Sequence, residues 1–122
     1  MKEKKLKEVL VWYKSNCSTC ISVKTLLKEA GYEPLFFEYI HEPIEEEKLR
    51  WLIDKLGIKA EALVRKKEPI YKEKYAEKKM SDKQWIKAMI KYPVLIERPI
   101  LIEGEKVIIG RPMERVIAFC KK

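Results

Sequence analysis

A junction between a strand-like run and a helix-like run constrains this chain most. The apolar run Val9-Leu10-Val11-Trp12-Tyr13 gives way to a helical pattern that begins beside Cys17 and Cys20. A helix N-terminus presents unpaired backbone N–H groups and a partial positive charge to whatever lies there. The first thiol of such a pair is therefore favoured as a thiolate, and the second can close a disulfide onto it. The sequence predicts a strand–helix unit with a redox-active pair at its turn.

Length and hydropathy indicate a single domain without a membrane span. The chain has 122 residues, enough to bury a core, and no stretch has the length of a transmembrane helix. The basic N-terminus precedes too few apolar residues for a signal peptide. We therefore expect a cytoplasmic protein with no membrane partner. In that compartment a Cys-x-x-Cys pair is more often catalytic or redox-sensing than structural.

The number of potential metal ligands and the net charge limit which metals and binding partners we expect. Besides the pair, the sequence offers Cys120 and His41 as soft metal ligands, too few for the usual zinc spacing. The net charge of +8 fits either an acidic partner or a solvated lysine-rich surface. Basic blocks are short and mixed with glutamates, as in Glu45-Glu46-Glu47-Lys48, so the solvated surface is favoured. We expect no metal, no bound cofactor and no direct nucleic-acid binding.

The first elements alternate between strand and helix. A strand is expected from Glu8 to Tyr13, a helix from about Cys17 to Ala30, and a second strand from Pro34 to Tyr39. Gly31 is suited to end the helix. The inward face of that helix is expected to comprise Val23, Leu26, Leu27 and Ala30.

The middle of the chain has helical patterns. One helix is expected to begin at Pro43 and to stop at Gly57, with glutamates near its positive end. Its buried stripe would comprise Leu49, Leu52, Ile53 and Leu56.

Three further helical segments are expected before the last quarter. Short helices are predicted around Ala60 to Lys66 and around Ile70 to Glu77. Ser81 and Gln84 form a capping box for a helix that runs through Lys91. The residues expected to face inward on that helix are Trp85, Ala88 and Met89.

The last quarter predicts a hairpin and a helix. Strands from Pro99 to Ile102 and from Lys106 to Ile109 flank a Gly104 turn, and a final helix starts at Pro112. We expect an α/β, thioredoxin-like fold with a mixed sheet. Its β-α-β and β-β-α halves are expected to be separated by a helical insert over about residues 43–92. The whole chain, residues 1–122, is expected to form a single domain. The inward residues of the final helix would be Met113, Val116, Ile117 and Cys120.

Three arginines stand in contexts suited to binding an anion. Arg98 directly precedes Pro99, Arg111 directly precedes Pro112, and Arg65 lies in a short apolar run. The planar guanidinium can hold an oxyanion with two parallel hydrogen bonds. Gathered near Cys17, the three would form an anion cradle beside a nucleophile. Taken singly, each is more simply interpreted as a surface arginine.

Three segments carry a family resemblance. They are Asn16-Cys17-Ser18-Thr19-Cys20; Leu56-Gly57-Ile58 with Ala62-Leu63-Val64-Arg65-Lys66; and Tyr92-Pro93-Val94-Leu95-Ile96-Glu97-Arg98-Pro99-Ile100 with Ile109-Gly110-Arg111-Pro112. From about Val9 to Phe119 the chain resembles the arsenate reductase family of the glutaredoxin-linked kind. That family also contains the Spx-type regulators of bacterial RNA polymerase.

The resemblance implies roles for particular residues. It makes Cys17 the nucleophile and Arg65, Arg98 and Arg111 the ligands of an oxyanion. It also implies that the peptide bond before Pro99 is cis and that this proline faces the active cysteine as a structural residue of the site.

The sequence also departs from the reductase pattern. Tyr13 and Ser15 stand where such reductases often have histidine and proline, and Ile21 stands where they usually have arginine. These changes remove positive charge near the cysteine, so the substrate stays open. The second thiol, Cys20, resembles Spx, whereas Gly110-Arg111-Pro112 resembles the reductases.

The leading expectation is a thiol-dependent oxidoreductase of arsenate-reductase type. Cys17 would attack a bound oxyanion, and Cys20 or glutathione as co-substrate would resolve the adduct, with glutaredoxin or thioredoxin as reductant. The alternatives are an Spx-type redox-switched regulator that binds RNA polymerase and a general disulfide reductase. Cys120 is expected to be a small buried residue. The alternative is that Cys120 acts as a resolving thiol from a distant part of the chain.

Overall fold

The computed structural model describes residues 7–14 and 18–121. The chain divides into two compact units. Unit 1 comprises Met1–Glu38 and Arg98–Lys122, and unit 2 comprises Tyr39–Glu97. The helical insert expected over residues 43–92 falls within unit 2, while the single domain spanning 1–122 stays a prediction.

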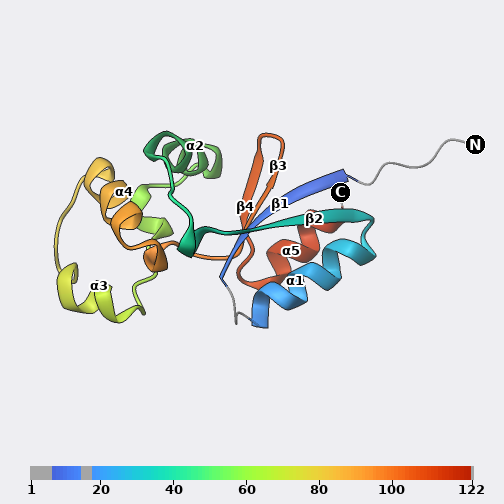
Figure 1. Ribbon diagram of the computed structural model, residues 1–122, viewed down its shortest axis with the longest axis horizontal. Helices are drawn as coiled ribbons and strands as arrows, with labels where there is room; N and C mark the ends of the chain where they lie inside the picture. Colours follow the sequence, from blue (N-terminus) through green and yellow to red (C-terminus); the bar gives the residue numbers. More distant parts are fainter. Residues whose placement is uncertain (1–6, 15–17, 122) are drawn as a thin grey trace, which may run out of the picture. The chain divides into compact units, whose positions relative to one another are not determined.

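Unit 1 is built on a four-stranded sheet of order β2-β1-β3-β4 (Figure 1). β1 runs parallel to β2 and antiparallel to β3, so Val11 lies between Phe36 on one side and Leu101 on the other. β4 pairs with β3 as the expected antiparallel hairpin. The mixed α/β sheet predicted from the sequence is thereby confirmed. The strands are β1 (Lys7–Tyr13), β2 (Tyr32–Glu38), β3 (Ile100–Glu103) and β4 (Lys106–Ile109).

Two helices, α1 (Ser18–Glu29) and α5 (Met113–Cys120), lie beside one another in unit 1 (Figure 1). Alternate residues of β1 point to one face of the sheet, where they pack against both helices. The buried members of this core come from the strands and from both helices. They are Val9, Val11, Val23, Leu27, Tyr32, Leu101, Val116 and Phe119.

Three details of unit 1 differ from expectation. Ala30 is exposed because α1 ends one residue earlier, and Ile117 is 38% exposed. α5 instead buries Val116 and Phe119, three residues apart on one face, and Ile117 lies about 100° around the helix from Val116. The second strand begins at Tyr32 and ends at Glu38, since Tyr39 enters a 3-10 turn.

Unit 2 consists of helices and 3-10 turns. α2 buries Leu49, Leu52 and Ile53 as its pattern predicts. It ends at Gly57, whose left-handed φ of 68° lets its N–H bond the carbonyls of Asp54 and Ile53. None of the described helices is long and apolar enough to cross a membrane. The elements are η1 (Tyr39–His41), α2 (Glu46–Leu56), η2 (Ala60–Leu63), α3 (Pro69–Lys74), α4 (Asp82–Lys91) and η3 (Pro93–Leu95).

The capping box at the start of α4 is confirmed. Ser81 Oγ accepts from the Gln84 N–H at 3.2 Å, and Gln84 Oε1 accepts from the Ser81 N–H at 2.9 Å. Both bonds satisfy donors that a helix leaves open. Downstream, the residues predicted to face inward are buried: Trp85, Ala88 and Met89.

Local pattern fails at three places in unit 2. Pro43 lies before the helix, because α2 begins at Glu46 after an extended Glu45. The helix expected through Lys66 stops at Leu63, since Val64 forms an antiparallel bridge with Ile96. Trp51, whose large apolar ring favours the core, is only half-buried, with Lys48 Nζ 4.4 Å from its ring centre.

Candidate functional site

Cys20, the second cysteine of the predicted pair, lies at the start of α1. Cys17, the predicted nucleophile, lies outside the described residues, and α1 begins at the next residue, Ser18. Cys20 is in the first turn of this twelve-residue helix and is 4% exposed. The open N–H groups of such a helix end favour a thiolate there.

Two of the three predicted anion ligands are brought together within unit 1. Arg111 Nε donates to the carbonyl oxygen of Arg98 at 2.6 Å, and the N–H of Gly110 donates to the carbonyl of Pro99 at 2.7 Å. The Arg98–Pro99 peptide bond is cis, as the resemblance implies, and so is Arg111–Pro112. The segments 98–99 and 110–111 are thus joined by two short hydrogen bonds.

Arg98 is not a surface residue. It is 7% exposed, which overturns the simple interpretation offered for each arginine taken singly, whereas Arg111 and Arg65 are half-buried. A buried guanidinium is costly unless its charge is used or matched, so this position is one where a functional role is favoured.

Gly110 has a steric reason for its place between these segments. A Cβ there would lie 3.0 Å from Pro99 Cγ, 3.1 Å from Val116 Cγ2 and 3.2 Å from Leu101 Cδ1. Those distances are closer than carbon atoms normally pack, so any larger residue would displace the proline beside Arg98.

Arg65 is held differently, within unit 2. Its Nε donates to Glu68 Oε2 at 3.3 Å and its Nη1 donates to Glu97 Oε1 at 3.2 Å. Backbone bonds fix both ends: Arg65 N–H to the Leu95 carbonyl at 2.7 Å, and Glu97 N–H to the Leu63 carbonyl at 2.9 Å. The third predicted anion ligand therefore already carries two carboxylates.

Sequence reasoning did not single out either carboxylate. The spacing of Arg65 and Glu68, three residues apart, is a pattern that could have been read as an ion pair. Glu97 is 32 positions away and meets Arg65 only because Val64 bridges Ile96. No local pattern could have found it.

The third cysteine lies on α5, half-buried. Cys120 Sγ is 3.9 Å from the carbonyl oxygen of Leu26, to which it donates weakly. Burial raises the pKa of the Cys120 thiol above its ordinary value, so less thiolate is present near neutral pH. This environment favours a packing residue over a resolving nucleophile.

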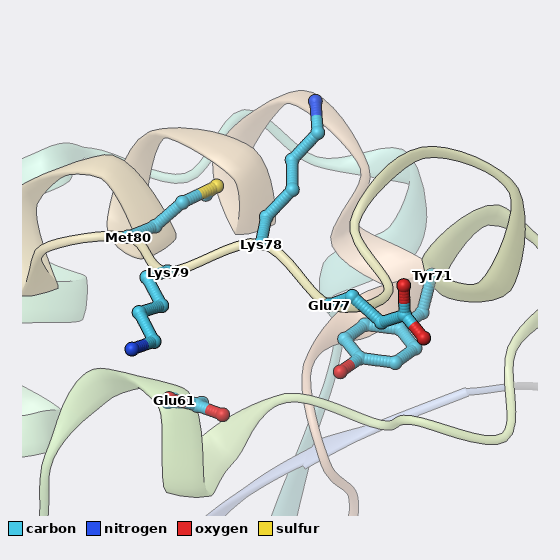
Figure 2. Close-up of a pocket in the computed structure, with 6 residues that line it drawn as sticks. All are labelled: Glu61, Tyr71, Glu77, Lys78, Lys79 and Met80. Atoms are coloured by element: carbon cyan, nitrogen blue, oxygen red, sulfur yellow. The ribbon is translucent and has the colours of Figure 1, made fainter.

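An open polar pocket of about 500 Å³ lies in unit 2 (Figure 2). Lys79 points toward Glu61, the carboxylate of Glu77 lies by the ring of Tyr71, and Lys78 extends away from them. Glu61 also pairs with Lys66 at 3.0 Å and raises the pKa of that lysine. None of the predicted site residues that the structure describes lines this pocket. Nor do three potential metal ligands gather anywhere among the described residues.

The sheet of unit 1 defines a protein of thioredoxin-like fold, in which α1 carries Cys20 and a hydrogen bond joins Arg111 to Arg98. Residues 12–119 match the ArsC family, and the chain belongs to that family. Family membership supports a thiol-dependent oxidoreductase function.

Relatives of known sequence or structure match along nearly the whole chain. The uncharacterized protein YfgD of Escherichia coli K12 is 39% identical over 113 residues, covering 91% of this chain and 95% of its own. An arsenate reductase from Escherichia coli is 31% identical, covering 92% of this chain and 80% of its own. The solved structure of an arsenate reductase from Vibrio cholerae matches with a TM-score of 0.85 at 31% identity, covering 93% and 98% of the two chains.

Proposed function

We propose that this protein is a thiol-dependent reductase of tetrahedral oxyanions, with arsenate as the first substrate to test. The observation that carries this proposal is the pairing of Arg98 with Arg111 in a family that includes arsenate reductases. Both guanidinium groups belong to unit 1, the unit that also contains the cysteine pair. Arg65 is the third proposed ligand.

The chemistry needs one nucleophilic thiol and one resolving thiol. The Cys17 thiolate forms a bond to the arsenic of arsenate, and one arsenate oxygen, taking up protons, leaves as water. A second thiolate then attacks the Cys17 sulfur, so that the sulfur–arsenic bond breaks and its electron pair stays on arsenic. Two thiols are oxidised to one disulfide, and As(V) is reduced to As(III), released as arsenite.

Two resolving thiols remain in competition. Cys20 would give an internal disulfide that thioredoxin or glutaredoxin then reduces. Glutathione would give a mixed disulfide for glutaredoxin. The burial of Cys20, at 4% exposure, favours attack from within over reaction with solvent oxidants, and therefore supports the internal route.

The test is a single turnover with arsenate and no other thiol. Free thiols are counted before and after in the wild type, in Arg98→Ala, and in Arg98→Lys, which keeps the charge if alanine prevents folding. Loss of two thiols that depends on Arg98 supports internal resolution, and a Cys20→Ser variant should then stop at the first step. No arsenate-dependent thiol loss in a folded wild type, together with no arsenite formed when glutathione and glutaredoxin are added, would overturn the proposal.

A second candidate is a redox-switched regulator of Spx type that binds RNA polymerase. The observation behind this candidate is Ile21, 68% exposed in α1 one residue after Cys20, at a position where such reductases usually carry an arginine. Binding of RNA polymerase is compared between the reduced protein and the diamide-oxidised protein. A redox-dependent difference without arsenate turnover would support this candidate, and turnover of small disulfides independent of the arginines would indicate a general disulfide reductase.

A further inference from the structure

The contact between Arg65 and Glu97 bears on how an anion reaches this arginine. The inference rests on the proposed role of Arg65 as an oxyanion ligand. A guanidinium presents two edges on which two N–H groups point the same way, one made by Nε with Nη2 and the other by Nη1 with Nη2. An oxyanion bound with two hydrogen bonds needs one complete edge.

In this structure each edge is already half occupied. Glu68 takes the Nε position of one edge at 3.3 Å, and Glu97 takes the Nη1 position of the other at 3.2 Å. Nη2 is common to both edges, and neither edge offers two vacant donors. A tetrahedral anion can therefore gain a complete edge of Arg65 only by displacing a carboxylate.

Glu97 is the carboxylate that can leave more readily. Its side chain is 30% exposed against 17% for Glu68, so it can reach water with less rearrangement. Glu68 is also the N-cap residue directly before α3, three positions from Arg65, and its N–H is bound to the Arg65 carbonyl at 3.3 Å. Among the described residues, the bond to Arg65 is the single polar contact of the Glu97 carboxylate.

The local charge points the same way. Two carboxylates face one guanidinium, and each of them repels an incoming anion. We propose that Glu97 is a specificity-determining residue, an internal anion that an oxyanion must displace from Arg65. Ligands with several charged oxygens, such as arsenate or phosphate, would displace it better than singly charged anions such as nitrate.

The backbone of Glu97 is suited to such an exchange. Its N–H is bound to the Leu63 carbonyl at 2.9 Å, and the neighbouring Ile96 carbonyl accepts the Tyr39 hydroxyl at 2.8 Å. The main chain is thereby fixed while the side chain is free to turn toward water. Replacing the carboxylate by an amide removes the charge and keeps the shape.

The experiment measures binding of inorganic phosphate to the reduced full-length protein by calorimetry. Phosphate has the shape and charge of arsenate but is not reduced by thiols. Glu97→Gln is expected to bind phosphate roughly three- to tenfold more tightly, the range for releasing a partly exposed ion pair. The gain should vanish when Arg65→Ala is added, and nitrate should remain a weak ligand of the wild type.

The matched control is Glu46→Gln. It removes the same charge from an Arg–Glu pair of similar length in the same unit, Arg50 to Glu46 at 3.1 Å, and should leave phosphate affinity unchanged. Unchanged, weaker or undetectable phosphate binding by Glu97→Gln would overturn the inference, as would an equal gain in Glu46→Gln. The function is tested separately: a wild type that loses no thiols to arsenate, and forms no arsenite when glutathione and glutaredoxin are added, contradicts the reductase while the Glu97 result stands.

Discussion

The two units hold their arginines by different means. In unit 1, Arg111 donates to a neutral backbone carbonyl oxygen, that of Arg98. In unit 2, Arg65 donates to two carboxylates, those of Glu68 and Glu97. A backbone acceptor orients a guanidinium without competing for the anion, whereas a carboxylate orients it and competes. The strength with which an arginine binds an anion therefore depends on the charge of the group that already accepts its hydrogen bonds, and not on its position alone.

The largest effect is expected from Arg111→Ala. Losing a guanidinium that is oriented by a neutral carbonyl should slow arsenate-dependent thiol loss by about 100-fold, the scale for an oxyanion-hole donor. Arg65→Ala should cost about tenfold, because its charge is already matched. Arg115→Ala, an exposed arginine on α5, is the control and should react like the wild type. Equal decreases in the rate for Arg111→Ala and Arg65→Ala would show that the charge of the acceptor does not distinguish the two arginines.

Gly110→Ala tests the close packing of Gly110 against Pro99 in unit 1. The new Cβ would meet Pro99 Cγ at 3.0 Å, so we expect a loss of about 1–3 kcal/mol in free energy of unfolding, the usual cost of overpacking. Urea unfolding measures it. Gly104→Ala is the control: it stands in open space at a φ of 61° and should cost about 1 kcal/mol. A Gly110→Ala variant with unchanged stability and unchanged turnover would show that the segments of Arg98 and Arg111 do not depend on this close contact.

Tyr39→Phe sharpens the description of unit 2. It removes the buried 2.8 Å hydrogen bond to the Ile96 carbonyl beside Glu97, and should cost about 1–2 kcal/mol in free energy of unfolding. Tyr92→Phe removes the same atom from a half-buried ring and should change stability by less than about 0.5 kcal/mol. Should the two variants unfold at the same urea concentration, the Tyr39 bond does not hold this segment.

The smallest effect is expected at Cys120. Because burial raises the pKa of this thiol from its ordinary 9.0, alkylation by iodoacetamide should be slower in the folded than in the unfolded chain and should accelerate only above that pH. Because burial disfavours the Cys120 thiolate in the folded chain, this thiol does not change the free energy of unfolding at low pH. It lowers the free energy of unfolding as the pH rises through 9.0. Cys120→Ala should leave turnover unchanged, and a loss of turnover would revive its role as a resolving thiol.

Elements with strong local signals were predictable from sequence. The capping box of Ser81 and Gln84 and the stop at Gly57 depend on neighbouring residues, and both are confirmed. The stretch after Ala60 was predicted as a helix, but Val64 pairs with Ile96, a partner far along the chain. Tertiary pairing outweighs a weak local preference there.

The site was predictable in its residue types and less so in their settings. The motif around Arg98 and Arg111 pointed to a shared role, and the structure joins these two through a hydrogen bond. Neither the burial of Arg98 nor the carboxylate of Glu97 on Arg65 could be read from spacing, because each depends on which distant segments meet. The roles of Cys17, Cys20 and the arginines in turnover stay predictions.

The place of β1 in the sheet has a consequence for synthesis on the ribosome. One edge of β1 pairs with β2, made shortly afterwards, but its other edge pairs with β3, which follows the whole of unit 2. While that stretch is being translated, an apolar strand has an open edge that nascent neighbours or chaperones can occupy. Chains released before Arg98 should therefore aggregate, and a ribosome slowed within unit 2 should lengthen the period of exposure.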